Sequence, residues 1–164
     1  MSEILSMPRA AQMILAASLL ALAFALTLQY GFGVQPCVLC LWQRAPYGAA
    51  AGAALLAWLW RPGPHVAAFL LFSCAACFLT GFGLAIFHSG VELHWWLGTS
   101  GCSIHPLNGA SADDLRNELL QTLPARCDQI TWTLAGLSMA NLNIGLSLLL
   151  AFFSTAAAAK ALDK

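Results

Sequence analysis

The sequence predicts an all-α protein, a transmembrane four-helix bundle with a long loop between its third and fourth helices. Its 164 residues are 60% hydrophobic and only 9% charged, whereas a soluble domain carries about 25% charged residues. The mean hydropathy is +0.75. Four apolar stretches approach the ~20 residues that a helix needs to cross a bilayer. None of them alternates in polarity as a barrel strand does, so each is predicted to be a helix.

Glycine and proline separate the apolar stretches. The run Gly31-Phe32-Gly33-Val34-Gln35-Pro36 breaks the chain after the first stretch, and Arg61-Pro62-Gly63-Pro64-His65 makes a tight connection between the second and the third. Ala21-Leu22-Ala23 resembles a signal cleavage site, but the apolar segment is too long for a typical signal peptide. An uncleaved first helix is therefore expected. The predicted spans are residues 10–30, 43–60, 66–87 and 133–153.

An even number of spans places both termini on one side of the membrane and the loops 31–42 and 88–132 on the other. Lys and Arg are nearly balanced between the two sides, so the positive-inside rule alone does not decide the orientation. Arg44 can snorkel from a helix start, and the other outer arginines lie in a long loop, where charge counts less. We expect cytoplasmic termini and a single integral membrane domain over residues 1–164.

Four of the six cysteines fall in the two loops on the same side. Cys37 and Cys40 lie in the first loop, and Cys102 and Cys127 lie in the second. Disulfides belong in an oxidising compartment such as the bacterial periplasm. The cysteines therefore agree with the orientation that was inferred from charge.

The Cys37-Val38-Leu39-Cys40 motif leaves several chemistries open, including a structural disulfide and two inert thiols. A zinc site of four cysteines would usually repeat the short spacing, which the second pair does not do, so no metal is expected. Haem attachment needs His where Leu41 stands. Redox chemistry remains, because a helix start stabilises a thiolate, and the positive Arg44 follows one turn after Cys40.

Two loops carry a resemblance to a known family. PCVLCLWQRAPY, over residues 36–47, resembles the first cysteine loop of the DsbB family of inner-membrane disulfide oxidases. HSGVELHWWLGTSGCS, which ends one residue after Cys102, and PARCDQITWTLAGLSM, which contains Cys127, are similar to the second. The resemblance covers roughly residues 10–155. It departs at Leu142, where tryptophan is often expected.

The resemblance implies a protein-disulfide:quinone oxidoreductase of the bacterial inner membrane. A reduced periplasmic DsbA-like protein with a thioredoxin fold would attack Cys102 and free Cys127, and that pair would reduce Cys37–Cys40. Cys40 would then pass the electrons, as a thiolate, to a membrane quinone, either ubiquinone or menaquinone. The expected quinone-binding residue is Arg44, four residues after the second cysteine of the motif. His88, where the third span leaves the membrane, is expected either to line the same quinone pocket or to be a plain interfacial histidine.

Other classes remain open from the sequence. The chain could be a non-enzymatic membrane subunit whose loops are locked by structural disulfides, or a DsbB paralogue that serves one client pathway. A formal net charge of zero gives no reason to expect nucleic acid, so the expected surroundings are the lipid bilayer and the soluble partner. A short amphipathic helix is also predicted over residues 111–123, from its acidic first turn and regularly spaced leucines.

Four residues inside the predicted spans have expected structural roles. Cys74 and Cys77 form a second CxxC in mid-helix, where thiols behave as small hydrophobes, and packing is expected. Asn141 and Asn143 are costly in lipid, so at least one of them should face the bundle.

Overall fold

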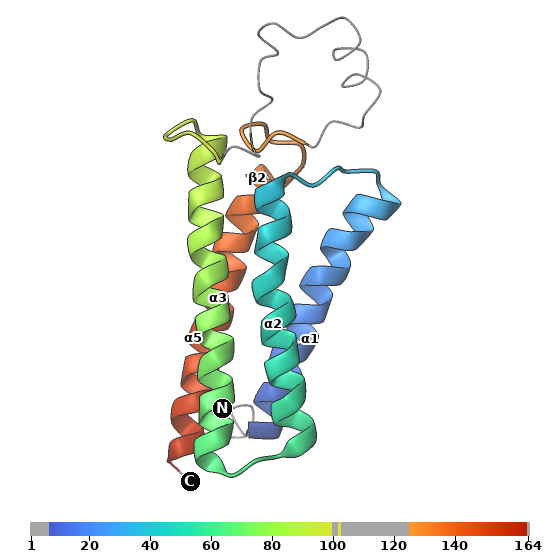
Figure 1. Cartoon of the computed structure of the whole chain (residues 1–164). Helices are drawn as coiled ribbons and strands as arrows, with labels where there is room; N and C mark the ends of the chain where they lie inside the picture. The colour runs from blue at the N-terminus through green and yellow to red at the C-terminus, as the bar shows by residue number, and fades with distance from the viewer. Residues whose placement is uncertain (1–6, 100–101, 103–124, 164) are drawn as a thin grey trace, which may run out of the picture.

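The computed structural model describes residues 7–99, 102 and 125–163. These residues form an all-α bundle of four long helices with one two-stranded hairpin (Figure 1). The predicted fold class is confirmed. The predicted helix over residues 111–123 lies outside the described residues. The elements are α1 (Met7–Leu26), the π-helical turn η1 (Thr27–Gly31), α2 (Val38–Trp60), α3 (Pro64–Glu92), β1 (Thr133–Leu134), β2 (Leu137–Ser138) and α5 (Met139–Leu162).

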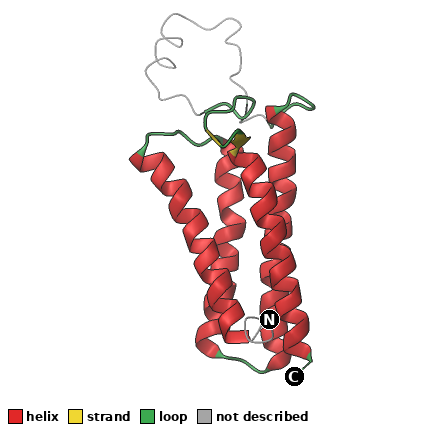
Figure 2. Ribbon diagram, turned by 180° about the vertical axis from the view of Figure 1, so that it is seen from behind, coloured by secondary structure: helices red, strands yellow, loops and turns green. Residues whose placement is uncertain are grey.

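The helices run side by side over most of their length, and α5 packs chiefly on α3. The start of α1, the end of α5 and the connection between α2 and α3 all lie at one end of the bundle (Figures 1 and 2). At the other end α1 leans away from α2, in both views. The described parts of the loops that carry the cysteines lie at this second end.

Small side chains form much of the contact surface between the helices. Ala50 and Ala54 on α2 are completely buried, together with Cys74 and Phe78 on α3. The Cys74 thiol donates to the carbonyl oxygen of Ala50 at 3.5 Å. Cys74 therefore packs in the core, as expected, and Cys77 packs against the same cluster.

The outward faces of the helices are apolar. Leu20, Phe69 and Phe152 each expose more than two thirds of their surface, which suits contact with lipid. Among the described residues, three helical segments are long and apolar enough to cross a membrane: Met7–Gly31, Pro64–Glu92 and Met139–Leu162. The predicted span 43–60 lies in α2, which runs beside these three and contains Gln43, Arg44 and Pro46 in its first turns.

Two helices extend further toward the cysteine end than was predicted. α2 begins at Val38 rather than at residue 43, because Cys37 caps it: the Cys37 sulfur accepts the Cys40 backbone N–H at 3.3 Å. α3 continues to Glu92 rather than ending at residue 87. His88 is therefore inside a helix, one turn before its end, and not in a loop.

The fourth helix begins later than the predicted residue 133 and ends later than residue 153. Residues 133–138 form a hairpin, in which Thr133 pairs with Ser138 across a two-residue turn at Ala135 and Gly136. Both turn residues have positive φ, 52° and 82°, as the type I′ turn of a tight hairpin requires. Ser138 then caps α5 by accepting the Asn141 backbone N–H at 3.3 Å.

Candidate redox site

The two cysteine pairs that were predicted from the sequence meet at one end of the bundle. Cys37 and Cys40 are free thiols whose sulfurs lie 3.2 Å apart. Cys102 and Cys127 form a disulfide across a separation of 25 residues. Cys37, Cys102 and Cys127 belong to one buried cluster, and Cys40 packs against it. A thiol pair and a disulfide therefore share a single packed environment.

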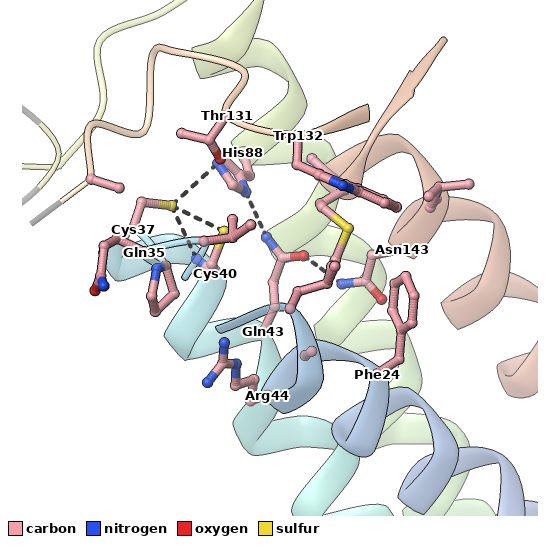
Figure 3. Close-up of a pocket in the computed structure, with 18 of the residues that line it drawn as sticks. Phe24, Gln35, Cys37, Cys40, Gln43, Arg44, His88, Thr131, Trp132 and Asn143 are labelled. Carbon is pink, nitrogen blue, oxygen red and sulfur yellow. Dashed lines mark hydrogen bonds between the residues drawn. The ribbon is translucent and has the colours of Figure 1, made fainter. Parts of the chain in front are cut away.

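Cys37 is surrounded by hydrogen-bond donors. Its sulfur accepts the Cys40 backbone N–H, and Nε2 of His88 lies 3.5 Å away (Figure 3). Hydrogen bonding to the Cys40 thiol is the largest influence, and together with His88 it lowers the pKa of the Cys37 thiol to about 4 despite the opposing effect of burial. The sequence led us to expect the thiolate at Cys40, whereas these contacts favour Cys37.

His88 connects Cys37 to polar groups that the sequence did not single out. It is almost fully buried, with 3% of its surface exposed. Its Nδ1 lies 2.9 Å from Nε2 of Gln43, and its Nε2 lies 3.8 Å from a carboxylate oxygen of Glu92. Helical spacing is the feature of the sequence that could have identified Gln43 and Glu92. Gln43 follows Cys40 by three residues and Glu92 follows His88 by four, and each separation is about one helical turn.

Arg44 joins α2 to the turn that ends α1. Its Nη1 donates to Oε1 of Gln29 in η1 at 2.6 Å. Its side chain also lines the cavity beside the cysteines (Figure 3). Arg44 and His88, the two predicted cofactor-binding residues, therefore line the same cavity from α2 and α3.

The cavity has a volume of about 220 Å³ and lies where α1 leans away from the other helices. Its polar wall includes Cys37, Cys40, Arg44 and His88. Most of the remaining wall is hydrophobic, and it comes from α1, α5 and the segment that follows Cys127. The hydrophobic residues that line it include Leu22, Phe24, Leu28, Trp132, Leu142 and Leu146.

Cys37, Cys40 and His88 also place their ligand atoms within 4.8 Å of one another. Two thiolates and an imidazole are a ligand set that suits Zn²⁺. Residue spacing along the chain does not indicate this arrangement, because His88 comes from a different helix. The cluster could therefore act as a thiol–imidazole metal site if Nε2 carried a lone pair.

A helical membrane protein with two cysteine pairs gathered at one end belongs, by architecture and chemistry, to the membrane thiol–disulfide proteins. Residues 8–157 match the family described as "Disulfide bond formation protein DsbB". This match covers most of the chain, so the chain belongs to the DsbB family. No curated protein and no solved structure matches it. Membership of this family makes the protein a component of membrane disulfide bond formation with a disulfide oxidoreductase role.

Proposed function

We propose that the protein is a disulfide oxidase of the bacterial inner membrane that reoxidises a periplasmic DsbA-like partner and passes the electrons to a membrane quinone. The observation that carries the proposal is the single buried cluster that holds both cysteine pairs beside a cavity. A relay between two pairs requires this proximity, because thiol–disulfide exchange proceeds through direct attack of one sulfur on another.

The first exchange takes place at the outer pair. A thiolate of the reduced partner attacks Cys102, the Cys102–Cys127 bond breaks, and a mixed disulfide forms between Cys102 and the partner. The partner's second thiol then displaces Cys102, so the partner leaves with a disulfide. Two electrons and two protons stay on Cys102 and Cys127.

The second exchange moves these electrons inward. When Cys37 and Cys40 are joined in a disulfide, attack by a thiolate of the outer pair opens that bond, and the outer disulfide forms again. The result is a disulfide between Cys102 and Cys127 and two thiols at Cys37 and Cys40. The structure has this arrangement of thiols and disulfide.

The side chains around the cavity fit a quinone. A quinone accepts two electrons and two protons, so it can return the inner pair to its disulfide. Arg44 donates hydrogen bonds and cannot accept them, which suits a carbonyl oxygen of the ring. His88 lines the wall nearest the thiols, and the hydrophobic lining suits the ring and its tail. Ubiquinone and menaquinone share this chemistry.

The proposed orientation places the cysteine end in the periplasm, with residues 1–164 as a single integral membrane domain and cytoplasmic termini. Its support is that the cysteine loops lie opposite the two helix ends nearest the termini (Figure 1). The rival class, a subunit with purely structural disulfides, gives no reason for an unbridged CxxC pair with a histidine beside it.

Quinone reduction by the purified full-length protein tests the proposal, with a reduced thioredoxin-fold partner as the electron donor. The wild type should turn over, and Cys37→Ser and Cys102→Ser should each abolish turnover. Cys77→Ser is the matched control, because this cysteine lies in mid-helix and away from the cavity. No quinone reduction by the wild type, or full turnover by Cys37→Ser, would reject the proposed function.

A further inference from the structure

A line of side-chain hydrogen bonds crosses three helices and ends at His88 (Figure 3). The amide nitrogen of Asn143 on α5 donates to Oε1 of Gln43 on α2. Nε2 of Gln43 then lies 2.9 Å from Nδ1 of His88 on α3. At the far end, Oδ1 of Asn143 accepts from the hydroxyl groups of Tyr47 at 2.6 Å and Ser147 at 3.0 Å.

The donors and acceptors of this line decide where the imidazole proton lies. An amide oxygen only accepts and an amide nitrogen only donates. Asn143 occupies the oxygen of Gln43, so the nitrogen of Gln43 is the atom that faces His88. Nδ1 of His88 must therefore accept, and in the neutral imidazole the proton is then on Nε2. Nε2 is the ring atom that lies 3.5 Å from the Cys37 sulfur.

We propose that Gln43 and Asn143 are positioning residues that hold His88 as its Nε2–H tautomer and so direct an N–H group at the sulfur of Cys37. The N–H favours the thiolate over the thiol, because only the thiolate is a strong acceptor. The effect on turnover rests on the proposed function, whereas the tautomer can be measured independently of it.

The opposite tautomer would change the chemistry of the site. A lone pair on Nε2 would accept a hydrogen bond from the Cys37 thiol, which favours the thiol over the thiolate. It would also complete the ligand set of two sulfurs and one nitrogen within 4.8 Å, which suits Zn²⁺. By placing a proton on Nε2, the line of amides removes that lone pair and disfavours metal binding at the thiol pair.

The other groups around His88 are compatible with this tautomer. Glu92, on the same helix, has one carboxylate oxygen 3.8 Å from Nε2, which is beyond hydrogen-bond distance, and a carboxylate is a favourable neighbour for an N–H group. Its second oxygen receives the hydroxyl of Ser138. Arg126, from the segment after residue 125, lines the same cavity, and its guanidinium is paired with Asp128.

Nitrogen-15 NMR of histidine-labelled, reduced full-length protein tests the inference directly. The wild type should give the Nε2–H pattern for His88. Asn143→Asp, measured where the new carboxylate is ionised, leaves only acceptors beside Gln43, so the Gln43 amide should turn and His88 should change to Nδ1–H. Asn141→Asp is the matched control, because Asn141 lies on the same helix but is hydrogen-bonded to Ser89 and not to Gln43. In this variant His88 should keep the tautomer of the wild type.

Gln43→Glu should also change the tautomer of His88 to Nδ1–H, because the carboxylate of the new glutamate can only accept a hydrogen bond from Nδ1. In both reversing variants the titration midpoint of Cys37 should rise by about one to two pH units, the size expected for losing a hydrogen bond to a charged group. Micromolar Zn²⁺ should bind them at least tenfold more tightly than it binds the wild type, as measured by a chromophoric zinc chelator.

An Nδ1–H tautomer in the wild type, or an unchanged tautomer in both variants, would overturn the inference. Loss of quinone reduction in the wild type would instead count against the proposed function alone.

Discussion

The sulfur of Cys37 lies 3.5 Å from Nε2 of His88, although the two residues are 51 positions apart in the chain. The contact exists because Cys37 caps α2 and α3 extends one turn beyond its predicted end. It turns a CxxC motif, which is ambiguous in sequence, into a thiol pair with an asymmetric environment. One sulfur receives several donors, and the asymmetry has consequences that can be measured.

The first prediction concerns the pH dependence of Cys37. Its thiol has an ordinary pKa of 9.0 and a folded-state pKa lowered to about 4, so the folded protein favours the thiolate. The contribution of the Cys37 thiolate to the stability of the folded, reduced protein is complete above the ordinary pKa of 9.0. It declines below that pH and is lost as the pH falls through about 4. Alkylation of Cys37 in the reduced protein should be independent of pH near neutrality and should slow as the pH falls through about 4.

The same measurement in two variants separates the causes of the lowered pKa. Cys40→Ala removes the largest cause and should raise the alkylation midpoint clearly, while Cys40→Ser keeps a hydroxyl donor and should raise it less. A midpoint near 9 in the unsubstituted protein would show that the donors around Cys37 have no influence.

The second prediction concerns Arg44. Arg44→Leu should weaken the apparent quinone affinity or slow quinone reduction by roughly ten- to a hundredfold, the equivalent of one charge-assisted hydrogen bond of about 1.5–3 kcal/mol. Exchange between Cys102–Cys127 and the soluble partner should survive. Arg44→Lys should keep part of the function, because lysine keeps the charge but loses the planar group. The two half-reactions are measured separately.

Gln29→Ala is the control for Arg44, because it removes the hydrogen bond between Arg44 and η1 but leaves the arginine in place. It should affect quinone kinetics less than Arg44→Leu does. Equal losses in the two variants would assign Arg44 to holding η1 against α2. A block in partner exchange alone would assign it to the docking surface.

The third prediction concerns Gly90, near the end of α3. A Cβ atom at this position would lie 2.0 Å from the indole ring of Trp96, which stacks on Phe87 and donates its N–H to the Phe87 carbonyl at 2.8 Å. Gly90→Ala should therefore displace Trp96 and lower stability by about 1–3 kcal/mol. Thermal unfolding and tryptophan fluorescence measure the two effects.

Gly83→Ala is the matched control, because it lies on the same helix and its Cβ would meet no atom within 4 Å. It should be neutral or stabilising by about 0.5–1 kcal/mol, since alanine is the better helix former. Equal stability of the two variants would mean that Trp96 moves at no cost.

The fourth prediction concerns the CxxC of α3. The double variant Cys74→Ser, Cys77→Ser should keep most of its quinone-reduction turnover, because Cys74 is a packing residue in the core and neither sulfur lines the cavity. A serine hydroxyl can also donate to the Ala50 carbonyl, as the Cys74 thiol does. A folded double variant without turnover would give this pair a redox role.

The sequence was sufficient to predict the helical bundle and the meeting of the cysteine loops, because hydropathy and Gly/Pro breaks are local signals. Residues 133–138 were wrongly assigned to the fourth helix, since an apolar run around Ala135 and Gly136 has no polar break. The contacts of Gln43 with His88 and Asn143 were not predictable. They depend on how three helices are rotated about their axes, and hydropathy does not specify that rotation. The prediction that at least one of Asn141 and Asn143 faces the bundle is confirmed. Asn141 is hydrogen-bonded to Ser89 on α3, and Asn143 is hydrogen-bonded to Gln43 on α2.

The central claim, that the two cysteine pairs form one electron relay, is tested most directly by a single turnover without quinone. Fully oxidised, quinone-free protein is mixed with one equivalent of reduced thioredoxin-fold partner, the thiols are alkylated, and the modified cysteines are identified by mass spectrometry. The relay predicts new thiols at Cys37 and Cys40 with the Cys102–Cys127 disulfide formed again. Thiols that remain at Cys102 and Cys127, with Cys37–Cys40 still oxidised, would contradict it.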